Sequence, residues 1–138
     1  MAVAFVTGGT RGIGLAVVEA LIARGDSVVL TGTTEDAVLR AEKAVEIAAG
    51  DATRVMGVAC DVRDRGQVRR ATDAAVQRFG GLDILVNNAG ILRDRMLFSM
   101  AEEEWDAVIK VHLKGTWAPS RVASEYWRNR AKSGETNN

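Results

Sequence analysis

The sequence predicts a doubly wound α/β fold, in which a parallel sheet lies between two layers of helices. Two observations predict it. Short apolar runs alternate four times with segments of helical periodicity, and the first three helical segments each end at a glycine. Alternation of this kind favours parallel strands joined by right-handed crossovers, the Rossmann-type three-layer α/β/α arrangement. We expect a single domain over residues 1–138.

The expected strands are runs of apolar and β-branched residues at 2–6, 27–31, 54–59 and 82–86. Near-continuous hydrophobicity suits strands that are buried on both faces. Helical periodicity covers 13–24, 35–49, 65–79 and 101–130. Gly115 and Pro119 interrupt the last stretch and predict a kink or a new helix start, because proline removes a helical hydrogen bond. The polar tail, residues 131–138, is expected to fray.

The composition argues against several classes of partner and location. The formal net charge is zero, with 18 basic and 18 acidic residues, so no global field attracts nucleic acid or an anionic membrane. No apolar run approaches the roughly 20 residues that span a bilayer. The N-terminus lacks the basic region of a signal peptide, and the one cysteine, Cys60, suits a reducing compartment as a small buried residue. We expect a cytoplasmic protein.

A glycine-rich loop lies between the first expected strand and the first helix, and it reads Thr7-Gly8-Gly9-Thr10-Arg11-Gly12-Ile13-Gly14. Gly8 suits a tight turn, Gly12 a close approach of the main chain to a pyrophosphate, and Gly14 close packing of helix on strand. The helix N-terminus would offer free N–H groups to the phosphates. A plain glycine turn is the alternative, but a position after a strand and before a helix favours dinucleotide binding.

The loop resembles the Thr-Gly-x-x-x-Gly-x-Gly signature of the short-chain dehydrogenase/reductase family. Asp61-Val62, Asn87-Asn88-Ala89-Gly90 and the stretch from Glu104 to Thr116 resemble the same family, in the same order. The resemblance implies that Asp61 holds the adenine ring. On the residues alone, Asp61 could instead cap its turn, and the two asparagines could be ordinary turn residues. The expected cofactor-binding residues are Gly8, Thr10, Arg11, Gly12, Ile13, Gly14, Thr33, Asp61, Val62, Asn88, Ala89 and Gly90.

The tip of the second expected strand favours NADP(H) over NAD(H). A site that prefers NAD usually places a carboxylate there to bind the ribose 2′-hydroxyl, and Gly32 occupies that position. Arg11 could pair with a 2′-phosphate, and the hydroxyls of Thr33 and Thr34 could donate to it. Arg11 could also be a solvated loop charge. The acidic residues Glu35 and Asp36 lie nearby and oppose an anion, so NAD(H) stays the alternative.

The resemblance implies a catalytic tyrosine, a lysine four residues later, a serine and an asparagine. The asparagine position falls on His112, a departure that also occurs in a branch with 3-hydroxyacyl-CoA dehydrogenases. An imidazole could join a proton relay, or neighbouring backbone could satisfy it. Because His112 is the only histidine, we expect no metal site.

The single tyrosine, Tyr126, is followed four residues later by Arg130, which superficially resembles Tyr-x-x-x-Lys. It comes before any strand that could carry the serine, and arginine does not substitute freely for lysine. We therefore expect Tyr126 to be a packing residue. The catalytic serine and Tyr-x-x-x-Lys segment are expected to be absent, which makes the chain a C-terminally truncated fragment with an open edge at its fourth strand.

The leading functional hypothesis is the cofactor-binding part of an oxidoreductase that transfers a hydride between NADP(H) and a small-molecule carbonyl or alcohol. The residues after Gly90 and the run Glu103-Glu104-Trp105-Asp106 resemble 3-oxoacyl-[acyl-carrier-protein] reductases of fatty acid metabolism. A 3-oxoacyl or 3-hydroxyacyl thioester is therefore the expected substrate, and a homo-oligomer is implied for the full-length parent. The alternatives are a catalytically inactive nucleotide-binding module or regulatory partner, and a structural protein that binds no nucleotide.

Overall fold

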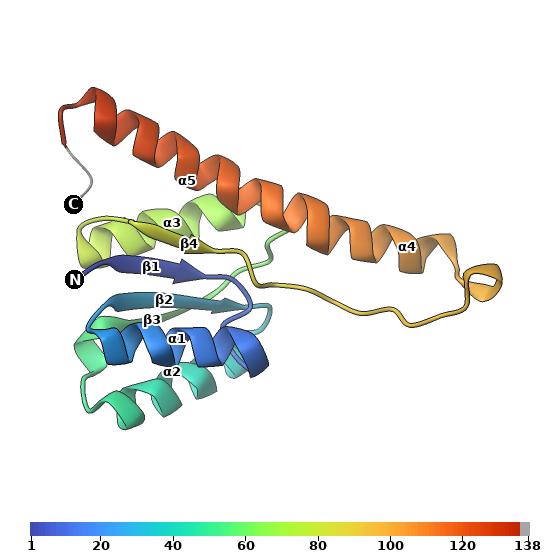
Figure 1. The fold of residues 1–138 in the computed structure, drawn as a ribbon, viewed down its shortest axis with the longest axis horizontal. Helices are drawn as coiled ribbons and strands as arrows, with labels where there is room; N and C mark the ends of the chain where they lie inside the picture. The colour runs from blue at the N-terminus through green and yellow to red at the C-terminus, as the bar shows by residue number, and fades with distance from the viewer. Residues whose placement is uncertain (136–138) are drawn as a thin grey trace.

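The computed structural model describes residues 1–135 and contains a parallel sheet between two layers of helices (Figure 1). The sheet has four strands in the order β3-β2-β1-β4, and every neighbouring pair is parallel. This arrangement confirms the predicted doubly wound fold. The strands are β1 (Val3–Val6), β2 (Ser27–Gly32), β3 (Val55–Ala59) and β4 (Ile84–Val86).

Helices cover both faces of the sheet, and the strands present alternate residues to each face. One face packs against α1 (Gly12–Arg24) and α2 (Glu35–Ala49), and the other against α3 (Arg65–Phe79) and α5 (Gly115–Lys132). In β1, Ala4 and Val6 belong to the core beneath α1 and α2, whereas Phe5 belongs to the core beneath α3 and α5. All three side chains are buried, which explains why the strand reads as a continuous apolar run.

Glycines end the first three helices, as the sequence predicts. Gly25, Gly50 and Gly80 follow α1, α2 and α3 in the left-handed conformation, with φ of 101°, 66° and 82°. Side-chain caps start two of these helices: Thr34 accepts from the Ala37 N–H at 3.3 Å, and Asp64 accepts from the Gly66 N–H at 2.8 Å. Local chemistry therefore sets the bounds of these elements.

The last helical stretch is interrupted at Gly115, where the sequence predicts a new helix start, but not at Pro119. Helix α4 (Glu102–Ile109) passes into a π-helical turn, Lys110–Lys114, which passes directly into α5 (Figure 1). A Cβ on Gly115 would lie 2.6 Å from a methyl carbon of Val62, so the glycine is needed for close packing on the loop after β3. Pro119 lies buried inside α5 and does not start a helix.

The C-terminal end of α5 is more ordered than predicted. Residues 131–132 belong to the helix, so the prediction of fraying is wrong for them, and the Ser133 hydroxyl donates to the Arg130 carbonyl at 2.8 Å. Residues 136–138, which the same prediction covers, lie outside the described residues. Within residues 1–135, no helix has the length and apolar character needed to cross a membrane.

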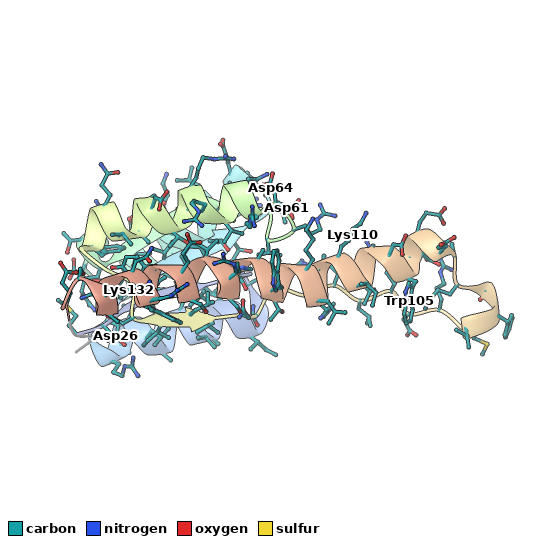
Figure 2. All side chains as sticks on the ribbon, turned by 90° about the horizontal axis from the view of Figure 1, so that it is seen from above. Asp26, Asp61, Asp64, Trp105, Lys110 and Lys132 are labelled. Carbon is teal, nitrogen blue, oxygen red and sulfur yellow. The ribbon has the colours of Figure 1, made fainter. Side chains whose placement is uncertain are left out.

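Helix α5 lies along the α3 side of the sheet, while α4 projects beyond the sheet (Figure 1). The indole N–H of Trp127 donates to the Leu82 carbonyl at 2.6 Å and ties α5 to the start of β4. Figure 2 shows Trp105 and Lys110 on the projecting part. Strand β4 ends the sheet on this side among the described residues.

Two carboxylates anchor the N-terminal strand. The Asp26 carboxylate accepts from the Ala2 N–H at 2.9 Å and from Arg24, and the Asp83 carboxylate accepts from the Val3 N–H at 2.9 Å. Burial raises the pKa of Asp26, but the hydrogen bonds from Ala2 and Arg24 lower it by more, so its pKa lies below the ordinary value. Asp26 is only 3% exposed, so its ionised form depends on these partners.

The first prediction concerns acid stability. A carboxyl whose pKa is lower in the folded chain stabilises the fold above its unfolded pKa, and this contribution is lost as the pH falls through the folded pKa. Urea unfolding between about pH 6 and about pH 3 should show a steep loss of stability below about pH 4. The Asp26→Asn variant should be less stable at the upper pH and lose less on acidification. The exposed Asp73→Asn variant should follow the unsubstituted chain; an Asp26→Asn profile parallel to that of the unsubstituted chain would contradict the assignment.

Candidate functional site

The loops that follow the four strands surround one cavity of about 550 Å³. It lies at the carboxyl ends of β1 to β4, where open α/β sheets bind ligands. The structure brings every residue of the predicted cofactor set to its wall: Gly8, Thr10, Arg11, Gly12, Ile13, Gly14, Thr33, Asp61, Val62, Asn88, Ala89 and Gly90. These residues come from four separate loops, so the site is assembled by the fold and is not contained in one sequence motif.

The glycine loop is closely packed against the loop after β4. Gly8 has a φ of +64°, and a Cβ there would lie 2.9 Å from the Cα of Ala89. A Cβ on Gly14 would lie 2.1 Å from the Gly8 carbonyl oxygen. The predicted roles of Gly8 in a tight turn and of Gly14 in close packing therefore agree with the structure.

Helix α1 directs its N-terminus at the cavity. Gly12 has a φ of +55°, and a Cβ there would meet no atom within 4 Å. The first helical hydrogen bond of α1 runs from the Leu15 N–H to the Arg11 carbonyl at 3.2 Å. The backbone N–H groups of the first turn precede that bond and belong to residues that line the cavity. A helix start of this kind favours a phosphate group.

A buried threonine hydroxyl joins the loops after β1 and β4. The Thr7 hydroxyl accepts from the Asn88 and Ala89 N–H groups, each at 3.0 Å, and donates to the Val86 carbonyl at 3.3 Å. The Asn88 side-chain amide donates back to the carbonyls of Thr7 at 3.1 Å and Gly8 at 3.0 Å. Thr7 is 1% exposed. The two loops are therefore fixed to each other by five hydrogen bonds through these two side chains.

The tip of β2 is crowded by side chains at the position that a carboxylate would occupy. A Cβ on Gly32 would lie 2.5 Å from the methyl carbon of Thr10 and 3.2 Å from a methyl carbon of Val38. Thr33 and Thr34 follow as exposed residues, and Thr33 lines the cavity. Position 32 therefore carries no charge against a phosphate, and Thr10 fills the space beside it.

Asp61 is engaged by a neighbour of its own loop. Its carboxylate accepts from the Arg63 N–H at 2.9 Å and pairs with the Arg63 guanidinium at 2.7 Å. The Arg63 side-chain hydrogen bond lowers the pKa of Asp61 more than burial raises it. Both contacts fit the alternative in which Asp61 caps its turn. Contact of Asp61 with an adenine ring stays a prediction.

Cys60 lines the cavity as a protonated thiol. The side chain is 3% exposed. Burial raises its pKa to about 11, and the carboxylates of Asp61 and Asp64 contribute to the rise. Figure 2 shows these two aspartates together at the start of α3. A thiol with a raised pKa is a poor nucleophile, in agreement with the expectation of a small packing residue.

His112 lies in the π-helical turn and contacts the loop after β4. Its Nε2 atom is 3.1 Å from the Ile91 nitrogen and 2.8 Å from the Ile91 carbonyl oxygen. Nε2 donates to the Ile91 carbonyl when it carries the proton and accepts from the Ile91 N–H when it does not. The ring also packs on Gly90, where a Cβ would lie 2.8 Å from the His112 Cε1 atom. Neighbouring backbone thus engages His112, and a part in a proton relay stays a prediction.

Tyr126 lies away from the cavity. It packs against the core beneath α3 and α5, and the Arg130 guanidinium carbon lies 5.8 Å from the centre of its ring. The prediction of a packing residue agrees with this position. Within residues 1–135, no group of three or more His, Cys, Asp or Glu side chains is arranged to hold a metal ion.

Sequence reasoning missed several residues that the fold brings to the site. Thr7 enters the sequence prediction only as part of the glycine motif, although a hydroxyl residue directly after an apolar strand is a usable signal. Two of the others, Arg63 and Ile91, directly follow predicted site residues, Arg93 lies in the same loop as Ile91, and the rest reach the wall from helices that carry no local signal of a site. In full, the others are Arg63, Ile91, Arg93, Ala107 and Val111 around the first cavity, and Arg40 beside it.

The sequence model of the family described as short chain dehydrogenase matches residues 2–136. The chain belongs to this family. It spans about half the length of the curated relatives it matches. It is 47% identical over 137 residues to the hydroxyacyl-CoA dehydrogenase ChsB1 of Mycobacterium tuberculosis, with 96% of this chain and 42% of that protein covered. It is 38% identical over 124 residues to the 3-oxoacyl-[acyl-carrier-protein] reductase FabG of Thermotoga maritima, with 90% and 49% covered.

Solved structures show the same fold. A short chain dehydrogenase from Mycobacterium avium superposes with a TM-score of 0.90 at 40% identity, covering 98% of this chain and 50% of that one. An alcohol dehydrogenase from the archaeon Thermococcus sibiricus, complexed with 5-hydroxy-NADP, gives a TM-score of 0.84 at 29% identity and covers 94% and 54%. The similarity extends over almost the whole of this chain and about half of each relative.

The second prediction tests the threonine contact. Thr7→Val keeps the shape of the side chain but leaves the N–H groups of Asn88 and Ala89 without their acceptor, so the free energy of unfolding should fall by about 2 kcal/mol or more. Thr7→Ser keeps the hydroxyl and should lose under about 1 kcal/mol, the scale of one methyl group. Urea unfolding measures both. Equal stability of the two variants would show that the hydroxyl does not hold the loops together.

Proposed function

We propose that this chain is the NADP(H)-binding part of an oxidoreductase that exchanges a hydride with a carbonyl or alcohol, on a 3-oxoacyl or 3-hydroxyacyl thioester. The observation that carries the proposal is the single cavity that gathers the glycine loop, the β2 tip and the loops after β3 and β4. The bound cofactor would supply the hydride. The chain's own residues would bind and orient it, and the cytoplasm is the proposed location.

The residues fit a nicotinamide dinucleotide. The first turn of α1 offers N–H groups for a pyrophosphate, and the space beside Gly12 is open, since a Cβ there would meet no atom within 4 Å. At the other wall, Asn88 and Ala89 are fixed by the Thr7 contacts. We propose that Asp61 and Val62, which line the cavity, border the adenine while the Asp61 carboxylate pairs with Arg63.

The proposed preference for NADP(H) depends on charge at the β2 tip. Gly32 offers no carboxylate to repel a 2′-phosphate, and the Thr10 side chain would have to shift to admit one. Arg11 and Thr33 lie at the same wall. The Thermococcus sibiricus relative was solved with 5-hydroxy-NADP, which supports a cofactor of this type.

The proposed substrate class comes from relatives of this chain. One is named a hydroxyacyl-CoA dehydrogenase and another a 3-oxoacyl-[acyl-carrier-protein] reductase, and both names describe acyl thioesters that carry a hydroxyl or a keto group. His112 at the asparagine position would hold the Ile91 backbone at the cavity wall. We further propose a homo-oligomer for the whole protein, with a small molecule as its substrate and neither nucleic acid nor membrane as a partner.

A second candidate function is nucleotide binding without catalysis by this chain. The observation that favours it is the position of Tyr126, the single tyrosine, in the core beneath α3 and α5. A regulatory or cofactor-sensing role would need the cavity but no acid/base residue. Turnover assays on the purified chain separate the two: hydride transfer to a 3-oxoacyl thioester would exclude the non-catalytic reading.

The third prediction concerns cofactor binding. Titration of the chain with NADPH and NADH, followed by calorimetry, should give tighter binding of NADPH. Gly12→Ala should weaken both cofactors, because it places a side chain and about 1 kcal/mol of left-handed backbone strain at the start of α1. Gly50→Ala introduces similar strain, at a φ of +66°, away from the cavity. It should leave both affinities unchanged.

The outcomes separate the parts of the proposal. Tighter binding of NADH would overturn the NADP(H) preference and leave dinucleotide binding intact. Equal binding by the Gly12→Ala and unsubstituted chains would overturn the placement of the pyrophosphate at α1. Failure of the chain to bind either cofactor, with its fold intact by circular dichroism, would overturn the proposed function.

A further inference from the structure

A second cavity of about 550 Å³ lies beside the first, between α1 and α2. The two cavities share Thr10, Arg11 and Thr33 as wall residues. They are therefore neighbours across the β2 tip. A group attached to a ligand at the tip would enter the second cavity. Its remaining wall consists of Leu15, Thr34, Ala37, Arg40, Ala41 and Ala44.

The polar groups around the second cavity are those that bind a phosphate. Arg11 and Arg40 bring two guanidinium groups from different elements, and Thr33 and Thr34 bring two hydroxyls. Guanidinium groups bind phosphate oxygens with paired, charge-assisted hydrogen bonds. Small alanines on the facing side of α2 keep the space open.

Arg40 is held by a contact that it can leave. Its guanidinium pairs with the Asp36 carboxylate at 3.0 Å, one helical turn away, and the two side chains are 74% and 77% exposed. Exposed pairs with this spacing contribute only about 0.3–0.5 kcal/mol. A phosphate with two negative charges would compete well against one solvated carboxylate.

The balance of charge at this cavity also needs Arg40. Glu35 and Asp36 lie in the first turn of α2 and oppose an anion. With Arg11 as the only cation, the two carboxylates of Glu35 and Asp36 would give the β2 tip a net negative charge. Arg40 adds a second positive charge and brings the local net charge to zero. A second cation therefore answers the objection that the two acidic residues raise against a 2′-phosphate.

We propose that Arg40 is a specificity-determining residue for the cofactor: its guanidinium moves from Asp36 to the 2′-phosphate, which it shares with Arg11. The inference rests on the proposed function, because it takes NADP(H) as the ligand of the first cavity. Asp36 acts as a competitor that weakens binding of the 2′-phosphate. Removal of Asp36 and removal of Arg40 should therefore have opposite effects on the same ligand.

The fourth prediction uses two nucleotides that differ only in the 2′-phosphate. Calorimetry compares adenosine 2′,5′-bisphosphate with adenosine 5′-monophosphate on the purified chain. Arg40→Gln should weaken the bisphosphate about tenfold, the scale of one partly solvated charge-assisted hydrogen bond, and leave the monophosphate unchanged. Asp36→Asn should strengthen the bisphosphate roughly twofold, since it removes an exposed ion pair that holds Arg40.

Lys43→Gln is the matched control. Lys43 is an exposed cation on the same helix and does not line the second cavity. Its removal changes the net charge by the same amount, so it should leave both nucleotides unaffected. Equal weakening by Lys43→Gln and Arg40→Gln would show a general field of α2 and would overturn the specific role of Arg40.

Two further measurements show whether the site needs the whole nucleotide and which of the two proposals a negative result overturns. Inorganic phosphate should bind weakly and without dependence on Arg40; Arg40-dependent binding of free phosphate at the affinity of the bisphosphate would assign an independent anion site and overturn the proposal. If the unsubstituted chain prefers the bisphosphate and Arg40→Gln keeps that preference, the role of Arg40 fails alone. If the unsubstituted chain binds neither nucleotide, the proposed function fails with it.

Discussion

The hydroxyl of Thr7 is the contact on which the shape of the cavity depends. It uses its donor and both acceptor sites within the protein, and each partner belongs to the end of β4 or the loop after it. Strands β1 and β4 are neighbours in the sheet but lie far apart in the sequence. Because this hydroxyl is buried, loss of one partner would leave a polar group without a hydrogen bond and without water. The glycine loop and the Asn87–Gly90 turn are therefore held as one wall.

The same packing explains where the chain tolerates no side chain. Gly8 and Gly14 stand where the loops after β1 and β4 meet, and Gly32 stands where Thr10 crosses the β2 tip. These close contacts leave an open space in front of the α1 N-terminus, toward which backbone N–H groups are directed. The cavity thus depends on close packing between the loops and on the small residues that line its wall.

Much of the fold and the site could be predicted from the sequence, because the signals are local. Glycines at 25, 50 and 80 mark the helix ends, and the apolar runs mark the strands. The rest depends on contacts between distant segments. The π-helical turn joins α4 to α5. The sequence marks Gly115 as an interruption of the helix, but it does not show that the glycine is needed for close packing on Val62. Arg40 lies in an ordinary amphipathic helix, and only the neighbouring α1 shows that it faces a cavity.

Hydrogen–deuterium exchange of the chain, with and without saturating NADPH, tests the central claim most directly. The account predicts protection in four separated segments, around residues 8–14, 31–34, 60–63 and 87–91, because these loops line the one cavity. The exposed turn that contains Leu97 and Phe98 does not line this cavity, so its amides should exchange at an unchanged rate. If bound nucleotide protects the turn with Leu97 and Phe98 and leaves exchange in the glycine loop unchanged, the assignment of the cavity as the cofactor site is contradicted.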